Sequence, residues 1–341
     1  MESEKGALFL KTILVTGGAG FIGNTFIKHI LQTYSDYIVL NVDVLTYAGK
    51  LENLDSVKDN KNYNFFEVDI CDRESIDDIF KSFDIDYVVN FAAESHVDRS
   101  IDDPDIFLKT NIFGTQVLLD VAKKYWKINP DNKYCREYKN GVKFVQISTD
   151  EVYGSLGATG LFTETTPLSP NSPYSASKAS ADLIVRAYHE TFGMPVNITR
   201  CSNNYGPFQY PEKLIPLMIN NCINDIALPV YGDGLQIRDW LYVDDHCKAI
   251  DVVLHRGEVG EVYNIGGNNE KANLEIVNLI IENLNKSKDL IKFVEDRPGH
   301  DRRYAIDGSK IKCDLGWTPE YSFEEGIIKT IDWYRNLKKS Y

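Results

Sequence analysis

Two adjacent carboxylates are the first residues in this sequence whose types and spacing could carry acid–base chemistry. Asp150 and Glu151 stand in the segment STDEVYG (148–154), directly after a run of apolar residues. Neighbouring carboxyl groups can act as separate acid and base when their surroundings set their pKa values apart. An ordinary acidic turn would contain the same two residues, so the pair does not by itself identify a function.

A tyrosine and a lysine form the second candidate pair. Tyr174 and Lys178, in YSASK, are four residues apart, which places them on one face of a helix and one turn apart. A free phenol has a pKa of about 10, and a neighbouring ammonium together with a cationic nicotinamide ring would lower it. The spacing is not specific, since Tyr334 and Lys338 repeat it. An exposed Tyr/Lys pair is the alternative interpretation.

A glycine-rich turn, TGGAGFIG, offers a site for phosphate groups. It contains the pattern G-x-G-x-x-G at Gly18, Gly20 and Gly23, and the variant that begins at Gly17 fits equally well. Such a turn lets a pyrophosphate approach bare backbone at a helix N-terminus. Asp43 is placed to accept hydrogen bonds from the adenosine ribose, and its charge would repel a 2′-phosphate, which favours NAD over NADP. The alternative is a glycine turn without a ligand.

Another acid stands at the end of the third apolar run. Asp69 and Ile70 could contact the adenine of a dinucleotide, because ligands of such sheets bind at the carboxyl ends of the strands. Asp69 could instead cap the helix that begins near Arg73. The spacing leaves both interpretations open.

Alternating strands and helices must position these residues. We predict strands at 11–16, 37–42, 63–68, 86–91 and 143–147, and helices at 22–34, 104–126 and 174–192. Continuous apolar strands separated by helices indicate a parallel sheet that is covered on both faces. The predicted fold class is therefore α/β: a Rossmann-like doubly wound parallel sheet with a smaller α+β substrate-binding domain.

The pattern changes after about residue 199, where Pro, Gly and Asn become dense and the apolar runs become short. We therefore expect an NAD-binding Rossmann-type domain at 7–200, with a return segment near 235–268. Residues 201–341 are expected to form mainly the substrate domain, since loop-rich regions carry recognition. The polar segment 129–140 is predicted to be an exposed loop.

Composition excludes several classes of function. The 341 residues contain 50 acids and 37 bases, a net charge of −13, which disfavours nucleic acid as a partner. Six cysteines without a Cys-x-x-Cys pattern indicate reduced thiols and no metal site. No apolar run approaches the roughly 18 residues of a membrane span. The N-terminal residues do not resemble a signal peptide, so the expected location is the cytoplasm and no membrane partner is expected.

Taken together, the motifs resemble those of the extended short-chain dehydrogenase/reductases, and within them the nucleotide-sugar 4,6-dehydratases. The resemblance runs from about residue 11 to 333. It is carried by GGAGFIG, STDEVYG and YSASK together with FAAESHVDRS (91–100), CSNNYGP (201–207) and RPGHDRRYAID (297–307). The carboxylate pair is the sharpest mark, because the similar sugar-nucleotide 4-epimerases generally carry small hydroxyl residues there.

The resemblance implies a reaction and a role for each candidate residue. Tyr174 would take the proton of the sugar 4-hydroxyl while hydride passes from C4 to NAD⁺, with Lys178 and Thr149 supporting that step. Glu151 would take the C5 proton, and Asp150 would protonate the departing 6-hydroxyl. Hydride would then return to C6, so that a tightly bound NAD is regenerated in each turnover. The implied substrate is dTDP-glucose or a similar sugar nucleotide, and the product is a 4-keto-6-deoxy sugar plus water.

The resemblance also implies two sets of binding residues. The NAD contacts would be Gly17, Gly20, Phe21, Ile22, Gly23, Asp43, Val44, Leu45, Thr46, Asp69, Ile70, Phe91, Ala92, Ala93, Thr110, Tyr174, Lys178 and Asn203. The substrate contacts would be Ser95, Thr149, Asp150, Glu151, Asn203, Lys213, Leu214, Pro229, Tyr231, Arg238, Asn273, Arg297 and His300.

Some of these substrate contacts have alternative interpretations. Arg238 and Arg297 could neutralise a diphosphate, and Tyr231 could stack on the base. Arg238 with Asp239, and the arginines of the run 297–303, could instead belong to surface ion-pair networks.

Other functions remain possible at this point. A UDP-sugar 4-epimerase or UDP-glucuronate decarboxylase would share the fold, as would a 4,6-dehydratase with another nucleotide. A non-enzymatic NAD-sensing protein should have lost Tyr174, Lys178 or the acids, and all four are present. The family also implies a homodimer, formed by the helices at 104–126 and 174–192.

Overall fold

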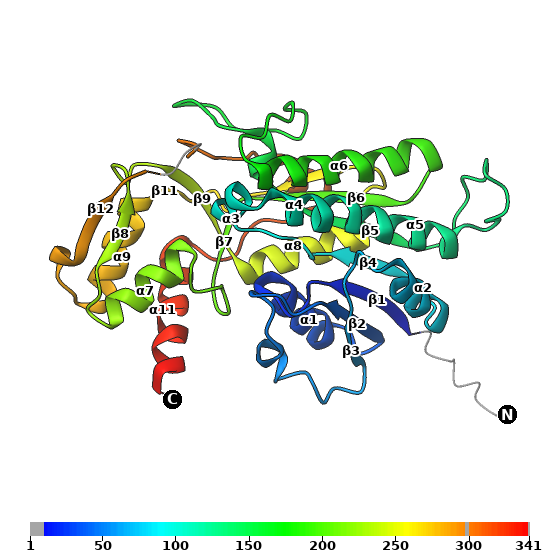
Figure 1. Cartoon of the computed structure of the whole chain (residues 1–341), viewed down its shortest axis with the longest axis horizontal. Helices are drawn as coiled ribbons and strands as arrows, with labels where there is room; N and C mark the ends of the chain where they lie inside the picture. Colours follow the sequence, from blue (N-terminus) through cyan, green and yellow to red (C-terminus); the bar gives the residue numbers. More distant parts are fainter. Residues whose placement is uncertain (1–9, 297–299, 340–341) are drawn as a thin grey trace.

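A seven-stranded sheet forms the centre of the computed structural model, which describes residues 10–296 and 300–339 (Figure 1). All neighbouring strands pair in parallel, in the order β10-β6-β5-β4-β1-β2-β3. This confirms the predicted Rossmann-like α/β class. The strands are β1 (Lys11–Thr16), β2 (Tyr37–Asp43), β3 (Tyr63–Glu67), β4 (Tyr87–Asn90), β5 (Lys143–Thr149), β6 (Val196–Cys201) and β10 (Val262–Ile265).

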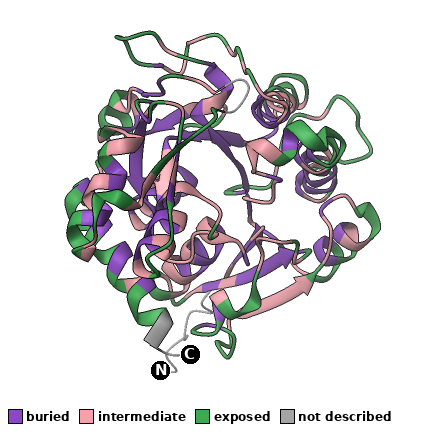
Figure 2. Cartoon of the chain, turned by 60° about the vertical axis from the view of Figure 1, so that its left-hand side comes forward, coloured by how far each residue is buried: buried purple, intermediate pink, exposed green. Residues whose placement is uncertain are grey.

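Helices cover both faces of this sheet. Alternate residues of β1 enter different cores: Ile13 and Val15 pack on one face, and Leu14 packs on the other. Both faces are therefore apolar, which explains the unbroken apolar run in the sequence. Figure 2 shows buried strands surrounded by helices with exposed outer sides. One face holds α1 (Phe21–Thr33), α8 (Val243–Arg256) and α10 (Ser309–Leu315), and the other holds α2 (Arg73–Ser82), α5 (Thr115–Trp126) and α6 (Pro173–Phe192).

The single helix predicted at 104–126 is wrong in detail. The chain forms α4 (Pro104–Phe107), a π-helical segment η2 (Leu108–Gly114) and then α5. The Asn111 side chain in the π segment donates to Glu94 O (3.0 Å) and to Ser177 Oγ (2.8 Å). Gly114 allows the close approach, because a Cβ there would lie 2.5 Å from Ile70 Cδ1. The wider turn ties this helix both to the loop after β4 and to α6.

Two further expectations are settled at helix and strand ends. The N-cap of α2 is Asp72, whose carboxylate accepts from Glu74 N and Ser75 N, so the alternative role of Asp69 as the cap is wrong. Asp69 accepts from Cys71 N instead. Strand β5 runs two residues farther than predicted and ends at Thr149.

A second region packs at one end of the molecule (Figure 1). Its core joins Tyr205, Trp240 and Phe323 with aliphatic residues of three helices. It contains a three-stranded sheet of β7 (Asn203–Tyr205), β9 (Ile237–Tyr242) and β11 (Glu270–Ala272), and a parallel pair of β8 (Leu228–Tyr231) and β12 (Ile291–Val294). Its helices are α7 (Leu214–Ile223), α9 (Asn273–Leu284) and α11 (Phe323–Lys339).

Short elements complete the fold: α3 (Val97–Asp102), η1 (Leu51–Leu54), η3 (Asp150–Tyr153) and η4 (Lys288–Leu290). Within the ranges 10–296 and 300–339, no helix has the length and apolarity that a membrane span requires.

A cluster of polar side chains joins α1 to α8. The Asp251 carboxylate lies 2.7 Å from His29 Nε2 and 2.7 Å from His255 Nδ1, and it accepts from Tyr34 OH at 2.9 Å. Burial works to raise the pKa of Asp251, but the hydrogen bonds with the two histidines outweigh it and hold that pKa below its usual range. Burial likewise lowers the pKa of His255, yet the bonds to Asp251 leave it raised.

We therefore predict that Asp251→Asn lowers the free energy of unfolding by about 1–3 kcal/mol, because it removes charge-assisted hydrogen bonds. A lowered carboxyl pKa stabilises the fold above the unfolded value of about 4, and a raised histidine pKa stabilises it below about 6.5. The loss should thus be largest between these values and should shrink as the pH rises through the folded pKa of His255. Urea unfolding from pH 5 to 8 measures it, with the exposed Asp55→Asn as control. A difference that does not change with pH would contradict the assignment.

Candidate active site

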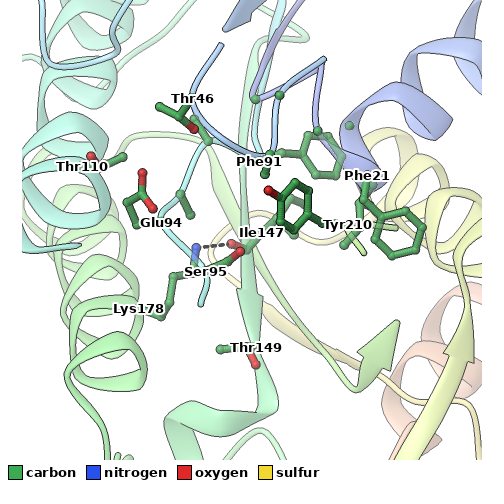
Figure 3. Close-up of a pocket in the computed structure, with 18 of the residues that line it drawn as sticks. Phe21, Thr46, Phe91, Glu94, Ser95, Thr110, Ile147, Thr149, Lys178 and Tyr210 are labelled. Carbon is green, nitrogen blue, oxygen red and sulfur yellow. Dashed lines mark hydrogen bonds between the residues drawn. The ribbon is translucent and has the colours of Figure 1, made fainter. Parts of the chain in front are cut away.

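A cavity of about 410 Å³ opens at the carboxyl edge of the seven-stranded sheet. Its walls come from the glycine turn, the ends of β2, β4 and β5, the π segment, α6 and the loop after β6 (Figure 3). The structure brings together here the following residues that the sequence predicted for the site: Gly17, Gly20, Phe21, Ile22, Gly23, Asp43, Val44, Thr46, Asp69, Ile70, Phe91, Ala92, Ala93, Ser95, Thr110, Thr149, Asp150, Glu151, Tyr174, Lys178, Asn203 and Lys213.

The glycine turn fits a dinucleotide. Gly17 has φ +68°, and a Cβ there would lie 2.7 Å from Ala92 N, so the turn and the end of β4 approach as bare backbone. No side chain caps the N-terminus of α1 at Gly20, and its first turn contains no acid. Its N–H groups therefore point at the cavity as an anion site.

Asp43 is held at the end of β2 by backbone donors. One carboxylate oxygen accepts from Ala19 N and the other from Leu45 N, each at 2.9 Å. Burial raises the pKa of Asp43, and these hydrogen bonds work against that rise. The arrangement fixes the carboxylate in the cavity wall where a ribose would need acceptors, so the residues present fit NAD.

The acid pair lies where β5 ends. Thr149 is the last residue of the strand, and its hydroxyl accepts from Glu151 N at 3.2 Å and lies 3.3 Å from Asp150 Oδ1. Asp150 is 2% exposed, and its second oxygen has no hydrogen-bond partner within the described residues. Burial raises the pKa of Asp150 well above its usual value, and the charges of Glu151 and Asp239 raise it further. Burial and these two charges thus favour the acid form of Asp150.

Tyr174 and Lys178 lie in the first turns of α6. The helix begins with a capping box between Ser172 and Ser175, which fixes the direction of these turns. Lys178 Nζ donates to Ile147 O at 2.7 Å, as the dashed line in Figure 3 marks. Both side chains are buried in the cavity wall.

The expected lowering of the tyrosine pKa does not occur in the chain by itself. Burial raises the pKa of Tyr174 well above its usual value, and the charge of Glu151 adds to the rise. Burial also lowers the pKa of Lys178. The prediction included the charge of the nearby ammonium but not the loss of water around the phenol. That loss is the larger influence on the pKa of Tyr174 here.

Several predicted substrate residues do not line this cavity: Leu214, Pro229, Tyr231, Arg238, Asn273 and His300. Tyr231 is 43% exposed, and its ring lies 6.4 Å from that of His300. His300 Nδ1 lies 2.6 Å from Asp296 Oδ1. These residues belong to the second region or its edges, beyond the acid pair. Leu45 also lies outside the lining, and Arg297 lies outside the described residues.

The surface ion-pair interpretation holds for Arg302, which pairs with Asp233 on the surface. It fails for Arg303, which is buried and forms two bonds with Glu270. Arg238 is buried: it donates to Asp301 O at 2.9 Å, and its guanidinium lies 4.3 Å from the ring centre of Tyr304.

Some residues that line the cavity were not predicted from the sequence. Glu94, inside FAAESHVDRS, and Gln209 and Tyr210, directly after CSNNYGP, all face the cavity. Their place in or beside those motifs was the available signal. Among the described residues, no group of three or more His, Cys, Asp or Glu side chains could hold a metal ion.

Comparison with known proteins places the chain in a family. It matches the GDP-mannose 4,6 dehydratase family over residues 14–330. It is 54% identical to the dTDP-glucose 4,6-dehydratase of Neisseria meningitidis serogroup B, over 96% of this chain and 94% of that protein. The crystal structure of the dTDP-glucose 4,6-dehydratase of Bacillus anthracis in complex with NAD is 53% identical, with a TM-score of 0.87 over 96% of this chain and 98% of that one. The enzyme of that name from Streptomyces venezuelae, also with NAD bound, is 44% identical, with a TM-score of 0.89 over 97% and 98%. The chain therefore belongs to the dTDP-glucose 4,6-dehydratase family of the extended short-chain dehydrogenase/reductases.

Proposed function

We propose that this protein is an NAD-dependent hydro-lyase that converts dTDP-glucose to dTDP-4-keto-6-deoxyglucose and water. One observation carries the proposal. A buried carboxyl group whose surroundings favour the acid form, Asp150, stands beside Glu151 and Tyr174 in the wall of a cavity that fits a dinucleotide. Elimination of water needs an acid and a base next to each other, and this arrangement supplies both.

NAD, when bound, accepts hydride from C4 of the sugar and later returns it to C6. Tyr174 takes the proton of the 4-hydroxyl, and Thr149 hydrogen-bonds near that hydroxyl. Lys178, whose Nζ donates to Ile147 O, would hold the ribose next to the nicotinamide. The positive charges of Lys178 and of the bound nicotinamide ring would favour the ionised form of Tyr174 that this step requires. The 4-ketone that results makes the C5 proton acidic.

The two carboxyl groups then divide the elimination between them. Glu151 takes the C5 proton while Asp150 gives its proton to the departing 6-hydroxyl. Burial and the charge of Glu151 raise the pKa of Asp150, which favours the protonated form that this step needs. After the hydride has reached C6, Glu151 returns a proton to C5. Glu151 thus acts at C5, and Asp150 acts at the 6-hydroxyl. The two carboxyl groups titrate as a pair, because the charge of one shifts the pKa of the other.

We also propose that two parts of the chain bind the cofactor and the substrate. Residues 7–200, with the return segment near 235–268, hold the cofactor, since α8 packs on α1 and β10 completes the sheet. Residues 201–341 hold most of the sugar nucleotide. Tyr231 offers an exposed ring for the base, and Arg238 offers charge for the diphosphate.

The experiment that tests the function is one incubation with dTDP-glucose in deuterated water, followed by mass spectrometry of the product. Loss of water together with one solvent deuteron at C5 is the expected result, because Glu151 exchanges its proton with solvent. An isomer of unchanged mass would identify a 4-epimerase instead. No change of mass with dTDP-glucose, but dehydration of a UDP- or GDP-sugar, would move the activity to another nucleotide.

Two variants separate the steps. Glu151→Gln should retain C4 oxidation but lose elimination, so reduced nicotinamide should accumulate on the enzyme and kcat should fall by roughly 10²–10⁴-fold. Tyr174→Phe should block oxidation, with a similar fall and no such absorbance. Stopped-flow absorbance measures both, with the exposed Glu282→Gln as control. Normal turnover of Glu151→Gln, or rapid absorbance in Tyr174→Phe, would overturn the assigned roles.

We propose further that the protein is a homodimer. Five large apolar side chains are 38–54% exposed on α3, α4, the π segment and α6, which pack against one another: Ile101, Ile106, Leu108, Phe113 and Leu183. An apolar patch of this kind on adjacent helices is typical of a protein interface.

Light scattering should give the mass of two chains for the wild type and of one chain for the double variant Phe113→Asp/Leu183→Asp. Ile226→Asp, at an equally exposed apolar residue after α7, is the matched control and should remain dimeric. A wild type with the mass of one chain, or a double variant with the mass of two, would contradict the proposed interface.

We place the protein in the cytoplasm. Its six cysteines are all free, and three of them, Cys201, Cys222 and Cys247, are buried without a partner thiol. Reduced thiols are usual in that compartment.

A further inference from the structure

Three segments far apart in the sequence meet beside the cavity: 44–49 after β2, 95–99 at the start of α3, and 208–213 before α7. The rings of Tyr47 and Tyr210 lie 5.3 Å apart at 84°, an edge-to-face contact. The guanidinium of Arg99 lies 3.7 Å from the ring centre of Tyr47. Tyr47 is thus held between a side chain of each of the other two segments.

Charged contacts join the same segments. Glu212 Oε2 pairs with Arg99 Nη2 at 3.1 Å, and Glu212 Oε1 lies 3.4 Å from His96 Nε2. Lys213 Nζ donates to Ser95 O at 3.0 Å. The Glu212 side chain is only 27% exposed, so its pairs are less screened by water than surface ion pairs.

These contacts bridge the two sides of the cavity. The cavity lining includes Thr46 and Ser95 on the side of the dinucleotide fold, and Tyr210 and Lys213 on the side that leads into α7 (Figure 3). Three residues outside the lining join its two sides. Tyr47 follows Thr46 in the chain and contacts the ring of Tyr210. Arg99, four residues after Ser95, contacts Tyr47 and pairs with Glu212, which precedes Lys213. The contacts of Tyr210 with Tyr47 and of Glu212 with Arg99 thus hold the segment before α7 against the loop after β2 and the start of α3 beside the cavity.

The reaction needs such a barrier. A reduced cofactor that left between oxidation at C4 and reduction at C6 would strand a half-converted sugar. We propose that Tyr47, Arg99, Tyr210 and Glu212 form a clasp that retains NAD in the cavity through the catalytic cycle. This proposal rests on the proposed function for its cofactor, and it assigns these four residues a part in keeping the cofactor rather than in the chemistry.

The test measures how fast bound NAD exchanges with isotopically labelled NAD, by mass spectrometry of the cofactor released from the denatured holoenzyme at successive times. Tyr210→Ala should raise the exchange rate by about tenfold through loss of the ring contact. Glu212→Gln should raise it by about threefold through loss of its ion pairs. Tyr210→Phe retains the ring, so its NAD should exchange at the wild-type rate. The control Glu282→Gln removes an exposed ion pair with Lys288 and should also leave the exchange rate unchanged.

A second experiment measures the rate of product formation over successive turnovers with no free NAD in solution. Tyr210→Ala should lose activity with each cycle and regain it when NAD is added, whereas the wild type should keep its rate. Tyr210→Ala and Glu212→Gln test the clasp independently, so the test stands if one of them fails to fold. The unfolding midpoint of each variant shows whether it is folded. Exchange at the wild-type rate in both Tyr210→Ala and Glu212→Gln would overturn the clasp and leave the proposed function intact. A wild type that binds no NAD would overturn the cofactor of the proposed function itself.

Discussion

Parallel pairing of β1, β4 and β5 is the constraint on which the site depends. Because the three strands run in one direction, their carboxyl ends meet at one edge, and each end delivers a different component. The first supplies the glycine turn, the second supplies the segment from Phe91 to Ser95, and the third supplies Thr149 and the acid pair. The pairing of the strands therefore makes a dinucleotide cradle and an acid–base pair neighbours at one edge of the sheet.

Loss of water then determines what these groups can do. Asp150, Tyr174 and Lys178 are buried, and in each of them burial is the largest influence on the pKa. Burial favours the protonated carboxyl and phenol, and it disfavours the charged form of the lysine. The negative charge of Glu151 adds to this effect for Asp150 and Tyr174. Surroundings that separate the pKa values of two neighbouring carboxyl groups let one act as the acid and the other as the base.

The second region packs beside the cavity at one end of the molecule. Its own core, around Tyr205, Trp240 and Phe323, lets it fold as a packed unit against the sheet edge. The segment that leads into α7 also reaches back across the cavity, where Tyr210 meets Tyr47. This connection therefore ties the second region to the loop after β2. The clasp proposed at that contact suits a reaction in which the cofactor is used twice.

The sequence is enough to predict the parallel sheet and the bounds of β1 to β5 to within two residues, because these follow from local apolar runs. Glycine spacing and motifs at strand ends, together with the family resemblance, predict most of the residues that line the cavity. Only the tertiary structure decided that Asp72 and not Asp69 caps α2, that the helix at 104–126 contains a π segment around Asn111, and that Tyr47 and Tyr210 touch. It also decided the direction of the Tyr174 pKa. These features depend on burial and on contacts between segments distant in the chain, and neither quantity is present in the spacing of residues along it.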